Sequence, residues 1–376
     1  MSSLLLYGSY GYVGRQVAAE LLERGTDPIL AGRDREALAE QVFELGLDRE
    51  SDRDRPGRRF DLEDPGVVDA ALEDVDCVLN CAGPFSNTAE PLVEGCLRTG
   101  ADYVDITGEI PVIESVQDRD EEAIDADVTL LPAAGFSVVP LDCLAAHVAE
   151  RLPEATDLAL GVDSFRVPSI GTIRTVIEGS DTGGAIRRDG ELEGVPANWR
   201  TRRIDFGRGT RPAVTMPMGD VSSAYYTTGI PNVEVYALMP QPARLVLRAH
   251  PYLAPLLATK PVQWTAKKLA GVREGPSERA RERGVAYLWG EAKTDDERVV
   301  SRLRTPDPYV VTVKAAVTAT ERVLVGDAPD GFQTPANAFG PEFVLELTDV
   351  ERFFDEENPP DPAGRGRKLA VPLPTR

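Results

Sequence analysis

The sequence predicts an α/β fold class: an N-terminal Rossmann domain with a doubly wound parallel sheet, followed by an α+β domain. Three observations support this. The stretch LLLYGSYGYVGRQVAAELLERG (4–25) contains an apolar run, three evenly spaced glycines and a helical pattern. Strand and helix patterns then alternate up to about residue 136, and strand patterns dominate from about Asp157. We expect a dinucleotide-binding domain over 1–140, a second domain over 141–350 and a proline-rich tail over 351–376.

The first strand–helix–strand unit contains the glycines. Residues 3–7 are apolar without alternation, a helical spacing of apolar positions begins at Val13, and residues 28–32 form the second strand. In such a unit the glycines let the chain turn, let the backbone approach a pyrophosphate and let the helix pack on the strand. Three glycines alone are weak evidence, so a turn that serves only packing stays open. The predicted cofactor-binding residues here are Gly8, Ser9, Tyr10, Gly11, Tyr12, Val13 and Gly14.

The end of the second strand indicates which dinucleotide is bound. A carboxylate about 20 residues after the glycines usually binds the ribose of NAD. Arg33 occupies that position here and Arg35 follows it, and guanidinium groups pair bidentately with phosphate. We therefore predict NADP(H) rather than NAD(H). In the alternative, Asp34 caps the next helix and Arg33 is only a solvated flanking residue.

Further strand–helix units follow, with strands expected at 58–62, 76–85, 102–106 and 128–136. The strand at 58–62 would end at the adenine side of the cofactor. The strand at 76–85 ends in a turn of small residues, which lets the main chain pass close to the nicotinamide ribose. The residues predicted to contact the cofactor from these two strand ends are Asp61, Leu62, Cys81, Ala82, Gly83, Pro84 and Phe85.

The second half of the chain is predicted to be rich in strands. They are expected at 157–163, 171–179, 213–218 and 232–239, with a hairpin over 285–303. Helices are expected to begin at Pro308 and near Pro335, because proline is favoured in a first helical turn. The apolar stretch 243–272 is interpreted as a core or dimer helix. A lid over an apolar substrate, or a surface that contacts lipid, is the alternative.

Charge and composition limit the classes of function. The 376 residues include 62 acidic and 41 basic side chains, for a net charge of −21. A surface that binds duplex nucleic acid needs the opposite sign, so no nucleic-acid partner is expected. An acidic, well-hydrated surface is typical of salt-adapted (halophilic) proteins. No run of about 18 apolar residues predicts a membrane span, and no basic leader precedes the first strand, so we expect a cytoplasmic protein.

Thiol and metal chemistry are not expected. The four cysteines lie in or beside apolar stretches without a C-x-x-C pair, which predicts buried thiols that act as small hydrophobic residues. Only two histidines are present, so little is available to form a zinc site and no metal is expected. His147 lies in an amphipathic helical pattern and is expected to be an ordinary helix-face residue rather than a catalyst.

With these motifs placed, the chain resembles the saccharopine dehydrogenase-like oxidoreductases, and within them the trans-acting enoyl reductase group. The resemblance covers nearly the whole chain. Its most specific part is the pair LNCAGPF (79–85) and ADYVDITGE (101–109). The other segments that carry it are GSYGYVG (8–14), AGR (31–33), EPLVEGC (90–96), AAGFSVVPLD (133–142), SIGTIRTV (169–176), GPSERAR (275–281), DPYVVTVKA (307–315) and GFQTPANAFG (331–340).

The resemblance implies a nicotinamide-binding domain followed by an α+β domain that forms the substrate side and a homodimer contact. It also implies NADPH-dependent reduction of a small-molecule substrate, at a C=C bond as in the enoyl reductases or a C=N bond as in the saccharopine reductases. The family commonly has an Asp–Ser pair where this chain has Ser137 and Val138, so a carboxylate contact is missing there.

Candidate catalytic residues lie at the nicotinamide end of the predicted sheet. The Tyr-x-x-x-Lys pair of the short-chain dehydrogenases is absent. Tyr103 and Asp105 project to one face of their strand, and Glu109 follows at its carboxyl end. A reductase needs a proton source besides its hydride donor, and a carboxyl serves at neutral pH when burial raises its pKa. We predict these three groups as the proton source. In the alternative, the two carboxylates only satisfy backbone donors at a turn.

Three functions therefore stay open. The first is an NADP(H)-dependent reductase of a small or lipid-linked unsaturated substrate. The second is a catalytically silent NADP-binding scaffold or sensor, and the third is an amino-acid or polyamine imine reductase. An apolar tunnel would favour the first of these, whereas charged side chains that converge on an amino-acid-sized pocket would favour the third.

Overall fold

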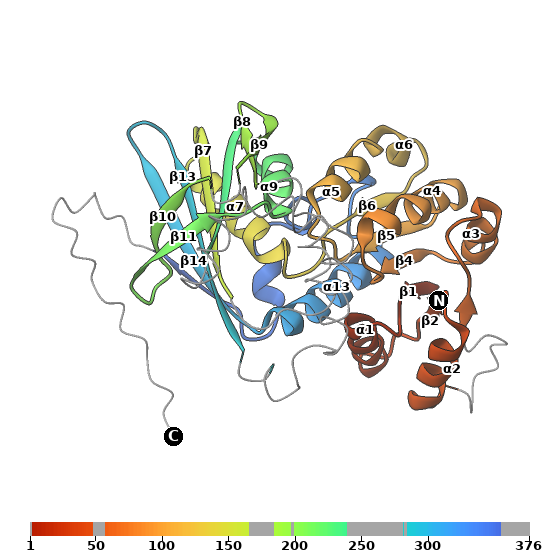
Figure 1. Cartoon of the computed structure of the whole chain (residues 1–376). Coiled ribbons are helices and arrows are strands. Elements are labelled where there is room, and N and C mark those ends of the chain that lie inside the picture. Colours follow the sequence, from red (N-terminus) through yellow and green to blue (C-terminus); the bar gives the residue numbers. More distant parts are fainter. Residues whose placement is uncertain are drawn as a thin grey trace, which may run out of the picture.

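Two β-sheets organise the chain in the computed structural model (Figure 1). The structure describes residues 2–47, 57–164, 184–196, 199–238, 281 and 284–354. The predicted strand at 171–179, the apolar stretch 243–272 and the tail beyond residue 354 lie outside these residues. Within the described part of the chain, no helix has both the length and the apolarity needed to cross a bilayer. The predicted α/β fold class is confirmed.

The first sheet has seven strands, all parallel, in the order β15-β6-β5-β4-β1-β2-β3. Without β15 this is the strand order of the Rossmann fold, and the order reverses between β1 and β4, which is where such sheets bind ligands. The strands are β1 (Leu4–Tyr7), β2 (Ile29–Gly32), β3 (Arg58–Arg59), β4 (Cys77–Asn80), β5 (Asp102–Asp105), β6 (Thr129–Leu131) and β15 (Gly331–Phe332).

Both faces of this sheet are buried, which explains its continuous apolar runs. In β1, Leu4 and Leu6 pack in one core and Leu5 and Tyr7 in the other, because side chains alternate along a strand. The helices with buried residues in the first core include α1 (Tyr12–Glu23), α2 (Arg35–Glu44) and α13 (Pro308–Leu324). Those packed in the second core are α3 (Pro65–Leu72), α4 (Ala89–Thr99), α5 (Ile110–Gln117) and α6 (Asp120–Asp125).

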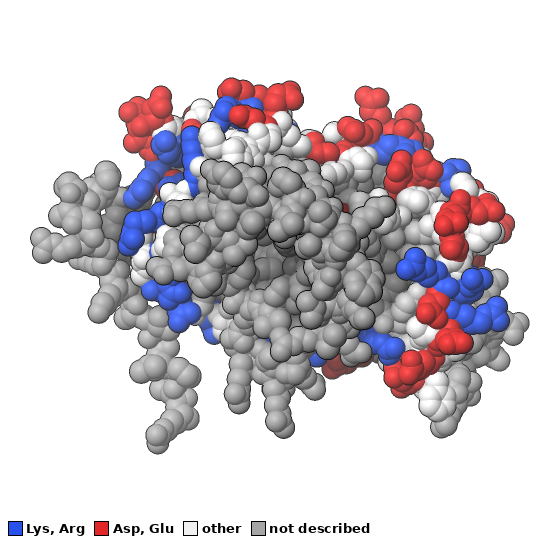
Figure 2. All heavy atoms as spheres, viewed as in Figure 1, with Lys and Arg blue, Asp and Glu red and all other residues white. Residues whose placement is uncertain are grey.

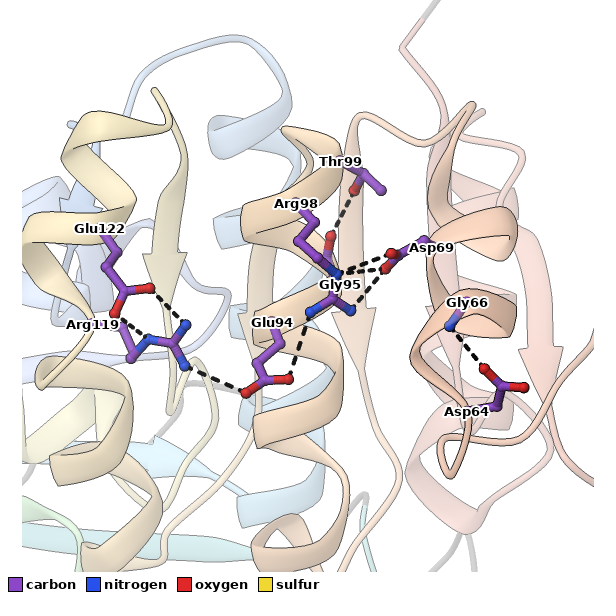
Figure 3. Close-up of polar contacts among 9 residues, drawn as sticks. All are labelled: Asp64, Gly66, Asp69, Glu94, Gly95, Arg98, Thr99, Arg119 and Glu122. Atoms are coloured by element: carbon purple, nitrogen blue, oxygen red, sulfur yellow. Dashed lines mark hydrogen bonds and ion pairs between the residues drawn. The ribbon is translucent and has the colours of Figure 1, made fainter.

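Ion pairs join the helices of the second core where they meet solvent (Figure 3). Arg98 on α4 donates to both carboxylate oxygens of Asp69 on α3, at 2.8–3.0 Å. Arg119 lies between Glu94 of α4 and Glu122 of α6, at 3.8 and 2.7 Å. Such solvent-exposed pairs stabilise a fold by about 1 kcal/mol or less each. The apolar packing beneath them therefore contributes most to holding these helices on the sheet.

The second sheet is mixed and lies beside the first, on the left of Figure 1. Strands β7 and β12 pair in parallel, and the other pairs are antiparallel. The predicted hairpin over 285–303 is confirmed as β13–β14, whose turn is closed by a hydrogen bond from Thr294 N to Glu297 O. The strands are β7 (Asp157–Asp163), β8 (Gly184–Arg188), β9 (Glu191–Val195), β10 (Thr201–Asp205), β11 (Thr210–Thr215), β12 (Asn232–Leu238), β13 (Val285–Lys293), β14 (Arg298–Pro306) and β16 (Glu351–Phe354).

Helices connect the two sheets. The helix α7 (Val139–Arg151) packs on β7, β13 and β14, and α9 (Asp220–Thr228) contacts both α7 and, in the first domain, α5. After β14 the chain returns to the first domain, where α13 packs against α1, β4 and β5. The short helix α14 (Pro335–Phe339) then packs on α7. Residues from the far end of the chain therefore complete the Rossmann domain.

Two predicted strands end earlier than expected because side chains turn the backbone. The strand predicted at 58–62 is limited to β3, since Asp61 accepts a hydrogen bond from Glu63 N and Asp64 caps α3. The strand predicted at 76–85 ends at Asn80, whose side-chain oxygen accepts a hydrogen bond from Ala82 N at 3.0 Å. The prediction of longer strands was wrong at both positions.

The strand predicted at 128–136 is also short and ends at Leu131. Ala133 adopts a left-handed conformation (φ 64°), and its N–H donates to the Asp105 carboxylate at 2.8 Å. The helix predicted from Pro335 is a single short segment, α14, because Gly340 ends it. Strands β8, β9, β10, β15 and β16 were not predicted. β15 has two residues and is a strand only because it pairs with β6, and β16 pairs with β14 where the predicted tail begins.

We expect the protein to lose stability as the pH rises from about 4 to about 6. Burial raises the pKa of Asp102, Asp105 and Asp142 to about 6 in the folded state, whereas an unfolded aspartate has a pKa of about 3.9. Between these values the folded state binds more protons, so its free energy of unfolding falls with increasing pH, by an amount on the order of a few kcal/mol.

Urea denaturation at several pH values measures this effect. Asp105→Asn should flatten part of the slope, because it removes one of the groups that bind protons on folding. Arginine partners lower the pKa of Asp69, and Arg24 and Lys314 lower that of Glu20, which opposes the trend weakly because these groups are near solvent. His147 opposes it over the same pH range, because burial lowers its pKa to about 4, but the three aspartates outweigh this one histidine. A stability that increases steadily across this pH range would contradict the prediction.

Candidate functional site

The glycine turn between β1 and α1 leaves no room for side chains. Gly8 has a φ of 75°, and a Cβ on it would lie 2.7 Å from the Cβ of Ala82 in the turn after β4. A Cβ on Gly14 would lie 2.2 Å from the carbonyl oxygen of Gly8. The first turn of α1 therefore packs directly on the turn, with its free N–H groups at the switch point of the sheet. This is the geometry that binds a pyrophosphate.

Two side chains within the glycine turn hold its shape. Ser9 and Gln41 of α2 exchange hydrogen bonds, at 2.7 Å between the side chains and 2.8 Å from the Gln41 amide to Ser9 O. The hydroxyl of Tyr10 accepts hydrogen bonds from the backbone N–H groups of Arg33 and Asp34, both at 3.1 Å. The turn and the end of β2 are thus held together. The sequence did not indicate Gln41, because an internal helical glutamine has no distinctive pattern.

Arginines gather beside the end of β2. Arg33, Arg35 and Arg59 line an open pocket of about 560 Å³ together with Asp34 and Glu36. Figure 2 shows basic and acidic side chains next to one another on the right-hand side of the molecule. Arg59 lies on β3, and its Nε donates to the carbonyl oxygen of Arg33 at 3.2 Å. Asp34 caps α2 by accepting from Glu36 N and Ala37 N. Asp34 therefore caps α2, as the alternative expected, while Arg33 next to it lines the pocket.

The remaining adenine-side residues have different surroundings. Asp61 is exposed, and Leu62 packs partly against the second core. Tyr7 at the end of β1 stacks on Phe60 with ring centroids 5.0 Å apart, and burial raises the pKa of Tyr7 to about 12. Tyr7 and Phe60 therefore pack the end of β1 against the segment after β3.

The turn after β4 forms the other half of the switch point. Its Gly83–Pro84 peptide bond is cis. Asn80 is fully buried, and its side chain bonds Ala82 N, the Thr88 hydroxyl and the Tyr103 hydroxyl at 3.0–3.1 Å. The residues predicted to contact the cofactor, Cys81 to Phe85, therefore form a turn that Asn80 holds beside the glycine turn. Asn80 has no sequence signature, because its role depends on strands that are distant in the chain.

The predicted catalytic residues lie together behind this turn. Tyr103 and Asp105 are 0% exposed, and their side chains hydrogen-bond at 2.8 Å. The Asp105 carboxylate also accepts hydrogen bonds from Thr107 N and Ala133 N, both at 2.8 Å. Burial raises the pKa of Asp105 to about 6 and that of Tyr103 well above its usual value.

Glu109 holds the cis-proline turn from the neighbouring strand end. Its two carboxylate oxygens accept hydrogen bonds from Phe85 N and Ser86 N, at 3.1 and 3.0 Å. It is partly exposed, unlike Tyr103 and Asp105. These hydrogen bonds show which backbone and side-chain groups Tyr103, Asp105 and Glu109 hold in place. The role of the three side chains in proton transfer stays a prediction.

The second domain meets the first near the ends of β5 and β6, the side on which the substrate is predicted to bind. The hydroxyl of Ser137 donates to Thr107 O at 2.9 Å, and that of Thr312 on α13 accepts from Phe136 N at 3.1 Å. Gly219 caps α9, and a Cβ on it would lie 3.1 Å from the carbonyl oxygen of Gly108. The first turns of α9 and α13 therefore reach the edge of the sheet where the nicotinamide of a bound dinucleotide would lie.

Other residues singled out in the sequence are structural in their surroundings. Cys77, Cys96 and Cys143 are buried free thiols, and burial raises the pKa of each. Cys81 is partly buried, and its pKa is raised in the same way. His147 is 7% exposed on α7, and burial lowers its pKa to about 4. This histidine is therefore neutral at physiological pH.

A Rossmann domain with an arginine-lined adenosine side, faced by a second mixed sheet, has the architecture of dinucleotide-dependent oxidoreductases. Residues 4–131 match the family model described as "Saccharopine dehydrogenase NADP binding domain". The N-terminal domain is therefore similar to the NADP-binding domain of the saccharopine dehydrogenases over these residues, and its cofactor is NADP(H). The resemblance and the cofactor predicted from the sequence are confirmed for this domain.

Solved and curated proteins agree with this placement. Apo saccharopine dehydrogenase (L-Glu forming) from Saccharomyces cerevisiae has a similar fold, with a TM-score of 0.65 and 14% identity over 95% of this chain and 100% of that one. The "Saccharopine dehydrogenase-like oxidoreductase" of Homo sapiens is 32% identical over 37% of this chain and 35% of its own length. The "Trans-acting enoyl reductase" of Mycobacterium tuberculosis is 30% identical over 48% of this chain and 44% of its own length. The chain thus spans less than half the length of these two curated relatives.

Proposed function

We propose that the protein is an NADPH-dependent reductase that acts on the C=C bond of an enoyl substrate. The observation that carries this proposal is the close contact between the glycine turn at Gly8 and the turn after β4 at Ala82, at the switch point of the sheet. The arginine-lined pocket lies beside this contact, at the end of β2. The likeness to trans-acting enoyl reductases supports the choice of a C=C bond.

The proposed reaction assigns a separate role to each group at the site. Bound NADPH supplies the hydride for the β-carbon of the substrate. Arg33 and Arg59 hold the 2′-phosphate, and the first turn of α1 binds the pyrophosphate. Tyr103 and Asp105 hold the ends of β5 and β6 in position. Glu109 is the exposed member of the predicted trio, so it is the one proposed to deliver the proton to the α-carbon.

The test follows NADPH absorbance with two probes: crotonyl-N-acetylcysteamine thioester for C=C reduction, and an imine formed from an α-keto acid and an amino acid for C=N reduction. We expect consumption with the thioester only. Glu109→Gln should slow turnover about 10²–10⁴-fold, typical for loss of a general acid. It should change the NADPH dissociation constant by less than about twofold. The exposed Glu122→Gln is the matched control and should change neither quantity.

Each other outcome identifies a different function. Consumption with the imine alone would make the protein an imine reductase. Tight NADPH binding without consumption across both probe classes would support a silent scaffold or sensor. If Glu109→Gln weakens NADPH binding but not turnover, Glu109 is a positioning residue. We also propose that the protein forms a homodimer, contacts lipid peripherally and is cytoplasmic. The NADPH assay does not test these three points.

A further inference from the structure

A buried polar network links three helices of the second domain behind the candidate site. Asp142 of α7 is fully buried, and its carboxylate accepts hydrogen bonds from the Thr227 hydroxyl at 2.6 Å and from Ala336 N at 2.8 Å. The hydroxyls of Thr227 and Thr334 are 2.5 Å apart. Asp142 thus connects α7 with α9 and with the beginning of α14.

One end of this network is unsatisfied. Asp220 and Ser223 of α9 are 0% and 1% exposed. Neither carboxylate oxygen of Asp220, nor the hydroxyl of Ser223, has a hydrogen-bond partner in the part of the chain that the structure describes. Buried polar atoms without partners are rare in folded proteins, and each one indicates a missing ligand, a water or a functional role.

The unsatisfied atoms point toward α7. Asp220, Ser223 and Thr227 are three and four residues apart, so they lie along one face of α9. The bond from Thr227 to Asp142 shows that this face packs on α7, which lies beside α9 in Figure 1. The Ser223 hydroxyl is close enough to favour the ionised form of Asp142, without reaching hydrogen-bond geometry.

The charge of this region is uncompensated. Burial and the neighbouring charge of Asp142 raise the pKa of Asp220 well above its usual value. Burial also raises the pKa of Asp142, and no cationic side chain of the described residues acts on either carboxyl. Two carboxyls and a hydroxyl therefore face one another in a region of low polarity. An isolated buried carboxylate is strongly unfavourable, so the region favours binding of a positive charge.

A proton alone does not satisfy these atoms. A proton on Asp220 would be shared with the facing carboxylate of Asp142, but the Ser223 hydroxyl would stay unpaired. A hard cation accepts several oxygen ligands at once. The described residues contain no cluster of three or more His, Cys, Asp and Glu side chains that could bind a metal, and calcium sites usually use 6–8 oxygens with several carboxylates. Two facing carboxyls do not readily ionise together, so the pair carries one negative charge, which a single positive charge balances.

We propose that Asp220, Ser223 and Asp142 form a buried site for an alkali cation, K⁺ or Na⁺, between α9 and α7. The site lies under the first turn of α9, whose cap Gly219 packs against Gly108 at the substrate side. An occupied site would therefore hold α9 against the loop that follows β5. This proposal is independent of the reaction that the protein catalyses.

Thermal unfolding of the full-length chain in KCl, NaCl and choline chloride at equal ionic strength and pH 8 tests the site. We expect a higher Tm in KCl or NaCl than in choline chloride, with a difference that saturates as the salt concentration rises. At ten times the dissociation constant the shift should be about 2 °C for a chain of 376 residues. The salt with the lower midpoint concentration identifies the preferred ion. Asp220→Asn should abolish the difference, whereas Asp296→Asn in the exposed β13–β14 turn should retain it.

Several outcomes would overturn the proposal. Equal Tm values of the wild-type chain in the three salts would mean that no alkali cation binds. A stabilising effect of acid with no difference between salts would mean that a proton occupies the site. Stronger stabilisation by MgCl₂ than by KCl or NaCl would exclude a monovalent site. If Asp220→Asn fails to fold, Ser223→Ala provides the test: its midpoint salt concentration should rise about tenfold, and an unchanged midpoint would contradict the site.

Discussion

Replacing Arg33 by alanine is expected to weaken NADPH binding about 10–100-fold and to leave NADH binding within about twofold. Arg33 is exposed at the end of β2 and lines the open pocket with Arg35 and Arg59. A hydrogen bond between a guanidinium and a phosphate contributes about 1.5–3 kcal/mol, and only NADPH carries the 2′-phosphate. The loss should therefore appear in the ratio of the two affinities. Titration of the nicotinamide fluorescence measures both dissociation constants.

Two further variants and a control distinguish the loss of a specific phosphate contact from the loss of any positive charge on the surface. The variant Arg59→Ala should lower NADPH affinity in the same direction, and the double variant should approach the affinity for NADH. Arg188→Ala is the matched control, because Arg188 is an exposed arginine that pairs with Glu193 in the β8–β9 hairpin. An unchanged preference for NADPH in the double variant would refute the assignment of the phosphate pocket, although the glycine turn could still bind a dinucleotide.

Replacing Glu114 by glutamine should lower the stability of the protein by about 2–4 kcal/mol. Glu114 lies on α5 of the first domain, and its carboxylate bonds Arg187 of β8 at 2.5 Å and the hydroxyl of Tyr226 at 2.7 Å. The Arg187 guanidinium lies 4.2 Å from the ring centroid of Tyr225, and its side chain is only 5% exposed. Removing one partner of a buried pair leaves an uncompensated buried charge, which typically costs about 3–5 kcal/mol. The partial exposure of Glu114 reduces that figure.

Thermal or urea unfolding measures the loss, which corresponds to a decrease in Tm of roughly 3–5 °C for a chain of 376 residues. The double variant Glu114→Gln/Arg187→Met should be more stable than Glu114→Gln alone, because it no longer buries an unpaired cation. Glu122→Gln, which breaks an exposed pair with Arg119 in Figure 3, serves as the reference and should cost about 0.5 kcal/mol or less. A Glu114→Gln variant as stable as this reference would show that the contact between the domains contributes little.

The accuracy of the sequence-based prediction differs between elements for physical reasons. Helix α13 and hairpin β13–β14 were placed correctly because each has a local signal: a proline in the first turn, or two alternating strands around a turn. β3 and β6 were predicted too long, because Asp61 and Asp105 bind backbone N–H groups that a longer strand would have used. Such side-chain bonds depend on partners that the apolar pattern does not reveal.

The residues of the candidate site also fall into two groups, those with a local signal in the sequence and those without one. The glycines, Arg33 and the small-residue turn could be predicted because the sizes and charges that a dinucleotide requires follow one another along the chain. Asn80 and Arg59 could not, because they act through residues on neighbouring strands. Asp220 gave no signal either. An aspartate at the start of a helix is ordinary, and only its burial against Asp142 distinguishes it.

The sequence by itself determined the Rossmann half of the protein, its glycine turn and its preference for a phosphorylated dinucleotide, because these depend on local geometry and on residue type. The tertiary structure alone decided which polar side chains lose their water and which partners they then meet. Glu109 at the cis-proline turn, Glu114 against Arg187 and the unpartnered Asp220 each result from packing elements that are distant in the chain. Desolvation depends on everything that surrounds a group, so no single stretch of the sequence could have revealed it.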